Sequence, residues 1–417
     1  MSLSRPRRLR TGAAAVLAAG ALAATGLAPA QAGPTPSAVA PLGDYIVVLD
    51  DDATAGRVAQ RHADRLGLTV GHVYSAALQG YSARMPAAAV PLLEALPQVQ
   101  SVEADRPVRT TAQSTPTGIA RTLATQSPTA SIDGVDDRVD VDVAVIDTGV
   151  QLNHPDLNVY RPGAKACGLL NLSADDAQGH GTHVAGTIGA LDNGTGVVGV
   201  APGARIWPVR VLNALGTGST SDVICGIDHV AANADEIEVA NMSLGGAGTD
   251  YGSCGAGRDA MHKAICNAVD AGVTFVVAAG NESSDAATST PAAYDEVITV
   301  SALADFDGRP GGLGQPTCRT DVDDTFADFS NYGADVDLIA PGVCIESTWL
   351  RGGYNTISGT SMASPHVAGG AALYLARNPG ASPAQVQAAL IAAGSDDWDA
   401  SDDPDGVKEP LLDVSAF

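Results

Sequence analysis

The sequence predicts an α/β fold with a doubly wound, mostly parallel sheet, preceded by a small α+β domain of the ferredoxin-like type. From residue 141 onward, short runs rich in Val, Ile and Ala alternate with helical stretches, which is typical of parallel strands covered on both faces. Between residues 45 and 103 the elements instead follow the order β-α-β-β-α-β, which indicates a split βαβ unit. A chain of 417 residues is long enough for both domains.

The first 32 residues have the pattern of an export signal, which we place at residues 1–32. Four arginines near the start precede an Ala-, Leu- and Gly-rich stretch at residues 12–27, and Ala30-Gln31-Ala32 forms a small-x-small cleavage site. The alternative is a membrane anchor, but the apolar stretch is short and Pro29 ends it. We therefore expect a secreted, extracellular protein with no membrane association once the signal is removed.

The small domain is expected at residues 44–112, after a linker rich in Pro, Ala and Ser at residues 33–43. Apolar runs predict its strands, and helical spacing predicts its two helices. In chain order we expect a strand at 45–49, a helix at 54–66, two strand pieces within 70–83, a helix at 88–96 and a strand at 99–103.

The large domain is expected at residues 113–417, and the stretch 106–138 reads as an exposed connection rich in Thr, Ser, Ala and Gln. Functional residues of an open parallel sheet belong at the carboxyl ends of its strands. Buried-looking runs predict strands at 141–146, 205–211, 239–243, 273–278, 297–300 and 336–339. Helices are expected at 180–189, 221–232, 260–271 and 361–377, and an acidic loop at 395–405.

Charge is distributed unequally along the chain. Residues 113–417 contain 13 basic and 39 acidic residues, a net charge of −26. No basic face is available to neutralise phosphates, which excludes nucleic acid as a partner. Such a charge favours solubility and the binding of cations.

Six cysteines occur, all of them after Asp147. An even count in an exported chain suggests up to three disulfides, for which 15 pairings exist. Pairing of neighbours would join Cys254 to Cys266 and Cys318 to Cys344, and would leave Cys167 for Cys225; the sequence alone does not decide among the pairings.

Three glycine-containing segments supply the groups that make a serine nucleophilic. Asp147 ends an apolar run, His180 lies in Gly179-His180-Gly181-Thr182-His183, and Ser361 precedes a long Ala- and Gly-rich run. A serine is activated when an imidazole takes its proton and a buried carboxylate orients the imidazole. At the start of a helix, Ser361 would also have free backbone N–H groups for a developing negative charge.

In this order of Asp, His and Ser, and in the string Gly359-Thr360-Ser361-Met362-Ala363-Ser364-Pro365-His366, the chain resembles the subtilisin-like serine proteases (subtilases) over residues 141–387. The resemblance implies a catalytic triad of Asp147, His180 and Ser361, with Asn281 as an oxyanion donor. It implies a serine endopeptidase that hydrolyses proteins or peptides through an acyl-enzyme. An esterase with the same triad and a binding pseudoenzyme without turnover are the alternatives.

The resemblance also assigns a substrate cleft in which glycines let an extended peptide add as a strand. Backbone-led binding implies broad specificity, and we expect a preference for uncharged side chains. The cleft residues are Gly216, Thr217, Gly218, Ser243, Leu244, Gly245 and Gly246, with Ala278, Ala279 and Gly280 on the wall of the pocket before the scissile bond.

The small domain looks like the propeptide of subtilases, which assists folding and inhibits the protease until it is cut away. The alternative is a free-standing ligand-binding domain. As a propeptide it would be an intramolecular inhibitor, autocleaved between about Thr110 and Ser114, so that the mature enzyme begins near Gln113. We expect the enzyme to be a monomer.

Calcium is implied by a further match to the family. Asp156 corresponds to a calcium-ligating Asp, and the loop 191–197 would add the amide of Asn193 and the carbonyls of Leu191, Thr195 and Val197. A second, weaker site would involve Asp337. His180 and His183 have a spacing that could hold zinc, but the resemblance instead makes His183 a packed helix residue, and we expect the same of His366.

Overall fold

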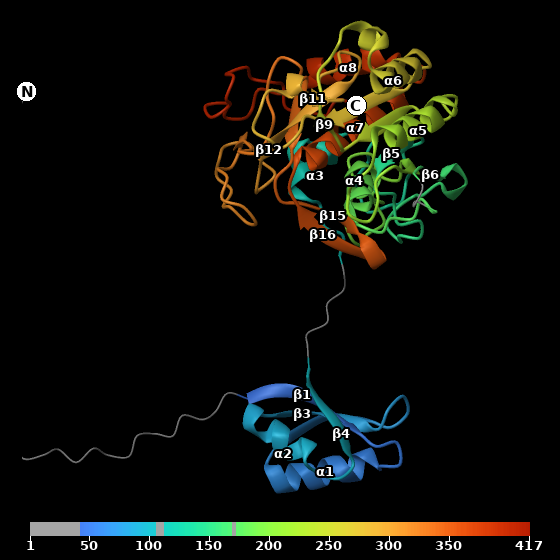
Figure 1. Ribbon diagram of the computed structural model, residues 1–417. Coiled ribbons are helices and arrows are strands. Elements are labelled where there is room, and N and C mark those ends of the chain that lie inside the picture. Colours follow the sequence, from blue (N-terminus) through green and yellow to red (C-terminus); the bar gives the residue numbers. More distant parts are fainter. Residues whose placement is uncertain (1–41, 106–111, 169–171) are drawn as a thin grey trace, which may run out of the picture. The chain divides into compact units, whose positions relative to one another are not determined.

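The computed structural model describes residues 42–105, 112–168 and 172–417, so the predicted export signal and most of the predicted linker lie outside the described residues. The chain divides into two compact units, residues 1–109 and 110–417 (Figure 1). Within the described ranges, no helix has the length and the apolar character needed to cross a bilayer.

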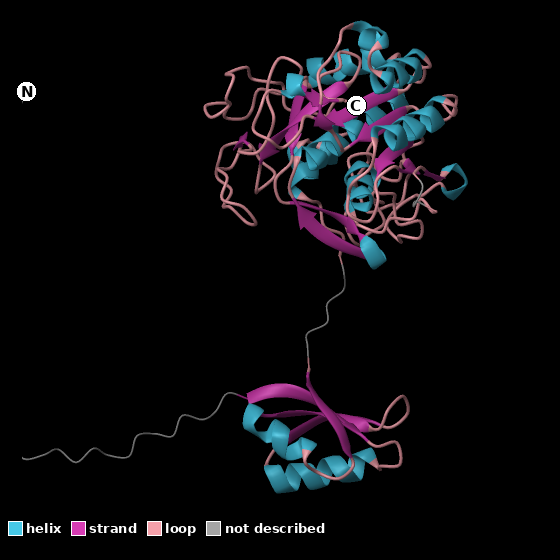
Figure 2. Cartoon of the chain, in the orientation of Figure 1, coloured by secondary structure: helices cyan, strands magenta, loops and turns pink. Residues whose placement is uncertain are grey.

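The small unit has the predicted β-α-β-β-α-β order. Its antiparallel sheet has the strand order β2-β3-β1-β4. Both helices lie on one face of this sheet (Figure 2), where Val47, Tyr81, Met85 and Leu93 form a buried core. The elements are β1 Leu42–Leu49, α1 Ala55–Leu66, β2 Thr69–Tyr74, β3 Gly80–Pro86, α2 Val90–Glu94 and β4 Val99–Ala104.

The large unit has a central sheet with the strand order β13-β12-β10-β8-β5-β7-β6, and β14 also pairs with β12. All of these pairs are parallel except β12 with β13. The strands are β5 Asp142–Asp147, β6 Lys165–Ala166, β7 Arg205–Arg210, β8 Val239–Met242, β10 Thr274–Ala278, β12 Ile298–Ala304, β13 Thr325–Phe326 and β14 Leu338–Pro341. The predicted doubly wound sheet is therefore confirmed.

Two hydrophobic cores cover the two faces of this sheet. Val143 and Val145 of β5 belong to one core and Ala144 and Ile146 to the other, because successive side chains of a strand point to opposite faces. Helices α4 His180–Gly189 and α7 Thr360–Arg377 pack in the first core, and α5 Thr220–Ala231 and α6 Ala260–Asp270 in the second (Figure 1). The four predicted helices are therefore present, with ends shifted by at most one residue.

Some elements were missing from the prediction. Helix α8 Pro383–Ala393 packs on α7, and an antiparallel hairpin joins β15 Ile345–Trp349 to β16 Gly353–Ile357. Residues 308–324 and the tail after residue 396 contact each other. Asp399 N donates to Asp324 O at 2.8 Å, and Trp398 is buried against Phe326 and Leu411.

The three disulfides follow the pairing of neighbours and confirm that prediction. They join Cys167 to Cys225, Cys254 to Cys266, and Cys318 to Cys344.

Candidate active site

Asp147 and His180 contact each other at the carboxyl end of β5. Asp147 is the last residue of β5 and fully buried, and its Oδ1 and Oδ2 lie 2.8 and 2.9 Å from His180 Nδ1. His180 is the first residue of α4. A side chain at Gly181 would collide with the carbonyl oxygen of Gly149, so a glycine after the histidine allows the helix to begin this close to the strand.

Asp176 fixes the start of α4. Its Oδ1 accepts hydrogen bonds from the N–H groups of Gln178 and Gly179, and its Oδ2 accepts from Thr182 N and Oγ1. Thr148, which follows Asp147, donates its hydroxyl to Asp176 Oδ1. These bonds satisfy N–H groups that a helix start leaves free, and they hold the imidazole beside the end of β5.

The environment of His180 favours its protonated form. Burial opposes the charge, but the carboxylate of Asp147, through its charge and its hydrogen bond, outweighs burial and raises the pKa of His180 above its ordinary value; Asp176 adds to this effect. The imidazole is therefore suited to accept a proton from a neighbour.

Ser361 lies in the first turn of α7. Its Oγ donates to Ser243 O at 3.3 Å, and Ser243 Oγ donates back to Ser361 O at 2.8 Å. In the described part of the chain, no hydrogen bond joins Ser361 Oγ to His180. Such bonds are often long before substrate binds and tighten in the complex.

Asn281 lies beside the backbone of Ser361. Its Oδ1 accepts hydrogen bonds from Thr360 N at 2.9 Å and Thr360 Oγ1 at 3.1 Å, which leaves Nδ2 as the free donor. Asn281 Nδ2 and Ser361 N lie 3.9 and 3.6 Å from the point that a Cβ on Gly359 would occupy. Asn281 Oδ1 is also 3.6 Å from this point, so both donor nitrogens lie near one position, which a side chain at Gly359 would occupy.

The cleft around these groups consists of two adjoining pockets that share residues 244–247. One, of about 600 Å³, contains His180 and residues 216–218 together with Ser243. The other, of about 490 Å³, contains Ser361, Asn281, Ala278 and Gly280. Except for Asp147, which is buried behind His180, and Ala279, which is also buried, the predicted catalytic and cleft residues line these two pockets.

Two family models match the chain, each to one of its units. Residues 139–406 match the subtilase family, and residues 44–111 match the peptidase inhibitor I9 family. The chain belongs to the subtilase family. It is a serine protease of the subtilisin type that carries a propeptide inhibitor domain.

Similar proteins agree with this assignment. The subtilase is 40% identical over 350 residues to an extracellular serine proteinase of Thermus sp. (strain Rt41A), which covers 78% of this chain and 73% of the relative. It is also 40% identical over 302 residues to subtilisin E of Bacillus subtilis (strain 168). This alignment covers 72% of this chain and 71% of the relative. A cold adapted subtilisin-like serine proteinase of known structure has a TM-score of 0.52 at 38% identity, over 68% of this chain and 92% of that chain.

The predicted calcium ligand Asp156 contacts the loop 191–197. Asp156 is buried, and its carboxylate accepts hydrogen bonds from Val197 N at 3.1 Å, Asn193 Nδ2 at 3.0 Å and the Tyr354 hydroxyl at 3.2 Å. Burial nevertheless raises the pKa of Asp156 to about 6. No hydrogen bond within the described residues reaches the carbonyls of Leu191, Thr195 or Val197. A buried carboxylate beside free carbonyls is a donor set that suits a hard cation.

Two features of this loop were not predicted. Asn193 turns its Oδ1 away from Asp156, since that oxygen accepts from Thr195 N and Oγ1. Gln113 holds the loop from the other side: its Oε1 accepts from Asn193 N and Gly194 N, and its own N–H donates to Gly194 O. Gln113 and Gly194 are 81 residues apart in the sequence, and no local sequence pattern predicts their contact.

His183, His366 and Asp337, which the sequence analysis also considered, are held by hydrogen bonds inside the fold. His183 Nε2 lies 2.9 Å from Ile345 O, and burial lowers its pKa to about 3. His366 Nδ1 lies 2.8 Å from Met362 O in α7, and burial lowers its pKa to about 4. Both carboxylate oxygens of Asp337 accept hydrogen bonds, one from Thr299 N and one from Gln387 Nε2.

Proposed function

We propose that this subtilase is a secreted endopeptidase in which Asp147, His180 and Ser361 act as a catalytic triad. The observation that carries the proposal is the double contact between buried Asp147 and His180 Nδ1, in a cleft that also contains Ser361 and a free Asn281 Nδ2. This arrangement supplies an oriented base, a hydroxyl and oxyanion donors for acyl transfer.

The reaction follows from the roles of these atoms. Asp147 accepts a hydrogen bond from Nδ1–H of neutral His180, so that the unprotonated Nε2 can take the proton of Ser361 Oγ as this oxygen attacks the scissile carbonyl. Ser361 N and Asn281 Nδ2 then donate to the developing oxyanion. His180 passes its proton to the leaving amine. Water then attacks the acyl-enzyme while His180 takes a proton from it, and His180 returns this proton to Ser361 Oγ as the carboxylic acid product leaves.

Substrate recognition relies on the backbone of the cleft. An extended peptide would add as a strand between residues 216–218 and 243–246, and backbone hydrogen bonds read no side chains. Ala278 and Gly280 would form a wall of the pocket for the residue before the scissile bond, which suits uncharged side chains. Ala279 is buried and does not line this pocket.

The small unit would act as the propeptide of this enzyme, as its match to the inhibitor family suggests. Cleavage between about Thr110 and Ser114 falls at the boundary of the two units, in a stretch that lies partly outside the described residues. Gln113, whose backbone and side chain bind the loop 191–197, would then lie at or near the new N-terminus.

Calcium would be bound by Asp156 and by the carbonyls of Leu191, Thr195 and Val197, with Asn193 joining them after its amide turns over. Bound there, the ion would supply charge balance for a buried carboxylate and no chemistry at the triad. It would therefore stabilise the fold, since a ligand that binds only the folded state adds RT ln(1 + [L]/Kd) to its stability.

Casein hydrolysis by the processed enzyme tests the proposal. We expect the wild-type enzyme to clear casein and to cleave amide substrates. Ser361→Ala, once a second protease has removed residues 33–112, should lose both activities while its circular dichroism spectrum matches that of the processed wild type. Hydrolysis of esters but not of matched amides would favour the esterase alternative, and a folded wild-type protein without turnover would favour the pseudoenzyme.

A further inference from the structure

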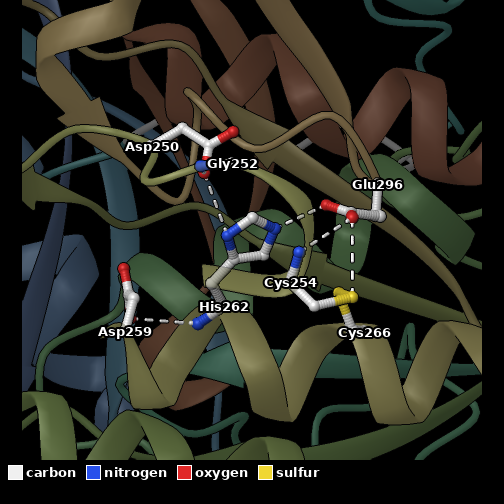
Figure 3. Close-up of a disulfide and its surroundings, with 7 residues drawn as sticks. All are labelled: Asp250, Gly252, Cys254, Asp259, His262, Cys266 and Glu296. Atoms are coloured by element: carbon white, nitrogen blue, oxygen red, sulfur yellow. Dashed lines mark hydrogen bonds and ion pairs between the residues drawn. A yellow bond between two sulfur atoms is a disulfide. The ribbon is translucent and has the colours of Figure 1, made fainter. Parts of the chain in front are cut away.

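A cross-linked cluster lies beneath the loop of residues 248–259, outside the triad (Figure 3). This loop connects β9 Gly246–Ala247, at the end of the predicted substrate segment, to the start of α6. The disulfide between Cys254 and Cys266 ties the loop to α6.

His262 is the centre of the cluster and is fully buried. Its Nε2 lies 2.5 Å from Glu296 Oε2, and its Nδ1 lies 3.2 Å from Asp250 Oδ1. The ring also stacks on Tyr294 at 4.0 Å, with an interplanar angle of 8°. Nε2 is hydrogen-bonded to Glu296, whereas Nδ1 lies near Asp250 without forming a hydrogen bond, so Glu296 and Tyr294 fix the ring of His262.

The partners of His262 connect three separate segments. Asp250 belongs to the loop 248–259, His262 to α6, and Tyr294 and Glu296 to the segment 291–297. Glu296 also accepts a hydrogen bond from Cys254 N at 3.4 Å.

A hydrogen bond between Tyr294 and Asp259 also joins these segments. The Tyr294 hydroxyl donates to Asp259 Oδ2 at 2.5 Å, and Asp259 Oδ1 accepts from the N–H groups of Met261 and His262 at the start of α6. Each of the three segments is thus bonded to both of the others.

Each segment also carries, or directly follows, a residue of the cleft wall. Ala247 precedes the loop, Met261 precedes His262, and Thr290 precedes the segment 291–297; all three line the pocket that contains His180. Gly246 pairs with Thr290 between β9 and β11 Ser289–Thr290, which joins the first and third of these segments again at the cleft.

Met261 and Thr290 line the pocket of His180 but not that of Ser361, whereas Ala247 lines both. Ser361 contacts Ser243, and Ala247 lies four residues further along the chain, at most about 13 Å away at ~3.3 Å per residue. A peptide that follows the segment would reach this wall with a side chain about four residues from its scissile bond, whereas a short substrate would not reach it.

We propose that His262, its carboxylate partners and the disulfide Cys254–Cys266 form a positioning device that sets the outer wall of the substrate cleft. This inference rests on the proposed peptidase function. His262 touches no substrate; it acts through Met261, Ala247 and Thr290. Loss of the device loosens the wall and weakens the binding of long peptides, while the triad and short substrates are unaffected.

The test compares two variants of the processed enzyme, Cys254→Ser/Cys266→Ser and His262→Gln, with the wild type. The control is Cys318→Ser/Cys344→Ser, which removes a disulfide whose residues line neither pocket of the cleft. The substrates are two chromogenic anilides that share the residue before the scissile bond; one is a capped dipeptide, and the other a capped tetrapeptide with Phe at its first position. Active-site titration corrects each rate for the amount of folded enzyme.

We expect KM for the tetrapeptide to rise ~10-fold in both variants, about the discrimination that a packed pocket gains from one methylene. KM for the dipeptide and both kcat values stay within about twofold of the wild type, as does the ratio of the two KM values in the control. Equal changes on both substrates, or the same change in the control, would mean a purely structural role and overturn the proposal.

Glu296→Gln provides the same test where the other variants do not fold, because it keeps the side-chain shape and all three disulfides. It removes only the negative charge of Glu296 that lies beside His262 Nε2. It should raise KM for the tetrapeptide alone; an unchanged ratio of the two KM values would overturn the proposal. A wild-type enzyme that hydrolyses neither anilide would instead contradict the proposed peptidase function.

Discussion

Asp147→Asn should inactivate the enzyme by forcing the wrong tautomer on His180. In the wild type, Asp147 Oδ1 accepts a hydrogen bond from Thr148 N at 2.6 Å and lies 2.8 Å from His180 Nδ1, whereas Oδ2 contacts only His180 Nδ1, at 2.9 Å. An asparagine would keep its carbonyl oxygen where Thr148 N donates, and so would place its NH₂ group against Nδ1. This group donates to Nδ1 and moves the imidazole proton to Nε2, where the proton of Ser361 has to be accepted.

The expected loss is large because the base is then blocked in every turnover. A tautomer error of this kind costs ~10⁴-fold in kcat in a serine protease triad, which corresponds to ~5 kcal/mol of transition-state stabilisation at ~1.4 kcal/mol per decade. The stability of the fold should change much less, because the asparagine keeps the shape of the side chain and its bond to Thr148 N.

The pH dependence gives an independent readout. Asp147 raises the pKa of His180, and the base works only when neutral, so wild-type kcat/KM should rise as the pH increases through this raised pKa. Removal of the carboxylate charge lowers the pKa of His180 and should move this acidic limb to lower pH. We would measure kcat/KM against pH with an amide substrate and titrate the active sites with a phosphonate. Loss of less than about tenfold in kcat, or an acidic limb at the wild-type position, would refute the reasoning.

Four further predictions concern other parts of the molecule. Asn281→Ala should lower kcat by ~10²–10³-fold, the loss known for this donor in subtilisin, with KM little changed; a kcat near that of the wild type would count against an oxyanion role. Excess EGTA should lower the melting temperature of the processed enzyme, because a site filled at 100 times Kd adds ~2.7 kcal/mol, and Asp156→Asn should abolish the difference; equal melting temperatures in calcium and in EGTA would disprove this. Arg121→Met should cost ~3–5 kcal/mol in urea unfolding, since Arg121, itself 4% exposed, lies 3.2 and 2.9 Å from the buried carboxylates of Asp305 and Asp324; a loss below about 1 kcal/mol would be contrary evidence. Ser361→Ala should accumulate with residues 33–112 still attached, and secretion of this variant already starting near Gln113, from a host lacking other proteases, would show that another enzyme makes the cut.

The sequence was informative where chemistry and local pattern coincide. The runs before Asp147 and Asn281 are buried strands, with the proposed catalytic residues at or just beyond their carboxyl ends, and the glycine at 181 reflects the close approach of α4 to β5. The helix that begins at Thr360 was predictable because its Ala- and Gly-rich run is long.

The remaining features depend on contacts between distant residues. Asp176 organises the start of α4, but an acidic residue four positions before His180 is not distinctive in a sequence. The acidic tail read as a simple loop, although Trp398 gives it a buried anchor against residues far along the chain. Likewise, nothing local relates Asp250 to Glu296, which become neighbours only because both face the same buried histidine.

Phosphonate labelling tests the central claim most directly. The processed enzyme, treated with a serine-reactive phosphonate and digested, should give one modified peptide in mass spectrometry, with the adduct on Ser361 and hydrolysis lost in proportion to labelling. The Asp147→Asn enzyme should label far more slowly, because its base cannot take the proton of the hydroxyl. An adduct on a different serine, or hydrolysis that survives full labelling of Ser361 and stops with a zinc-selective chelator, would contradict the account.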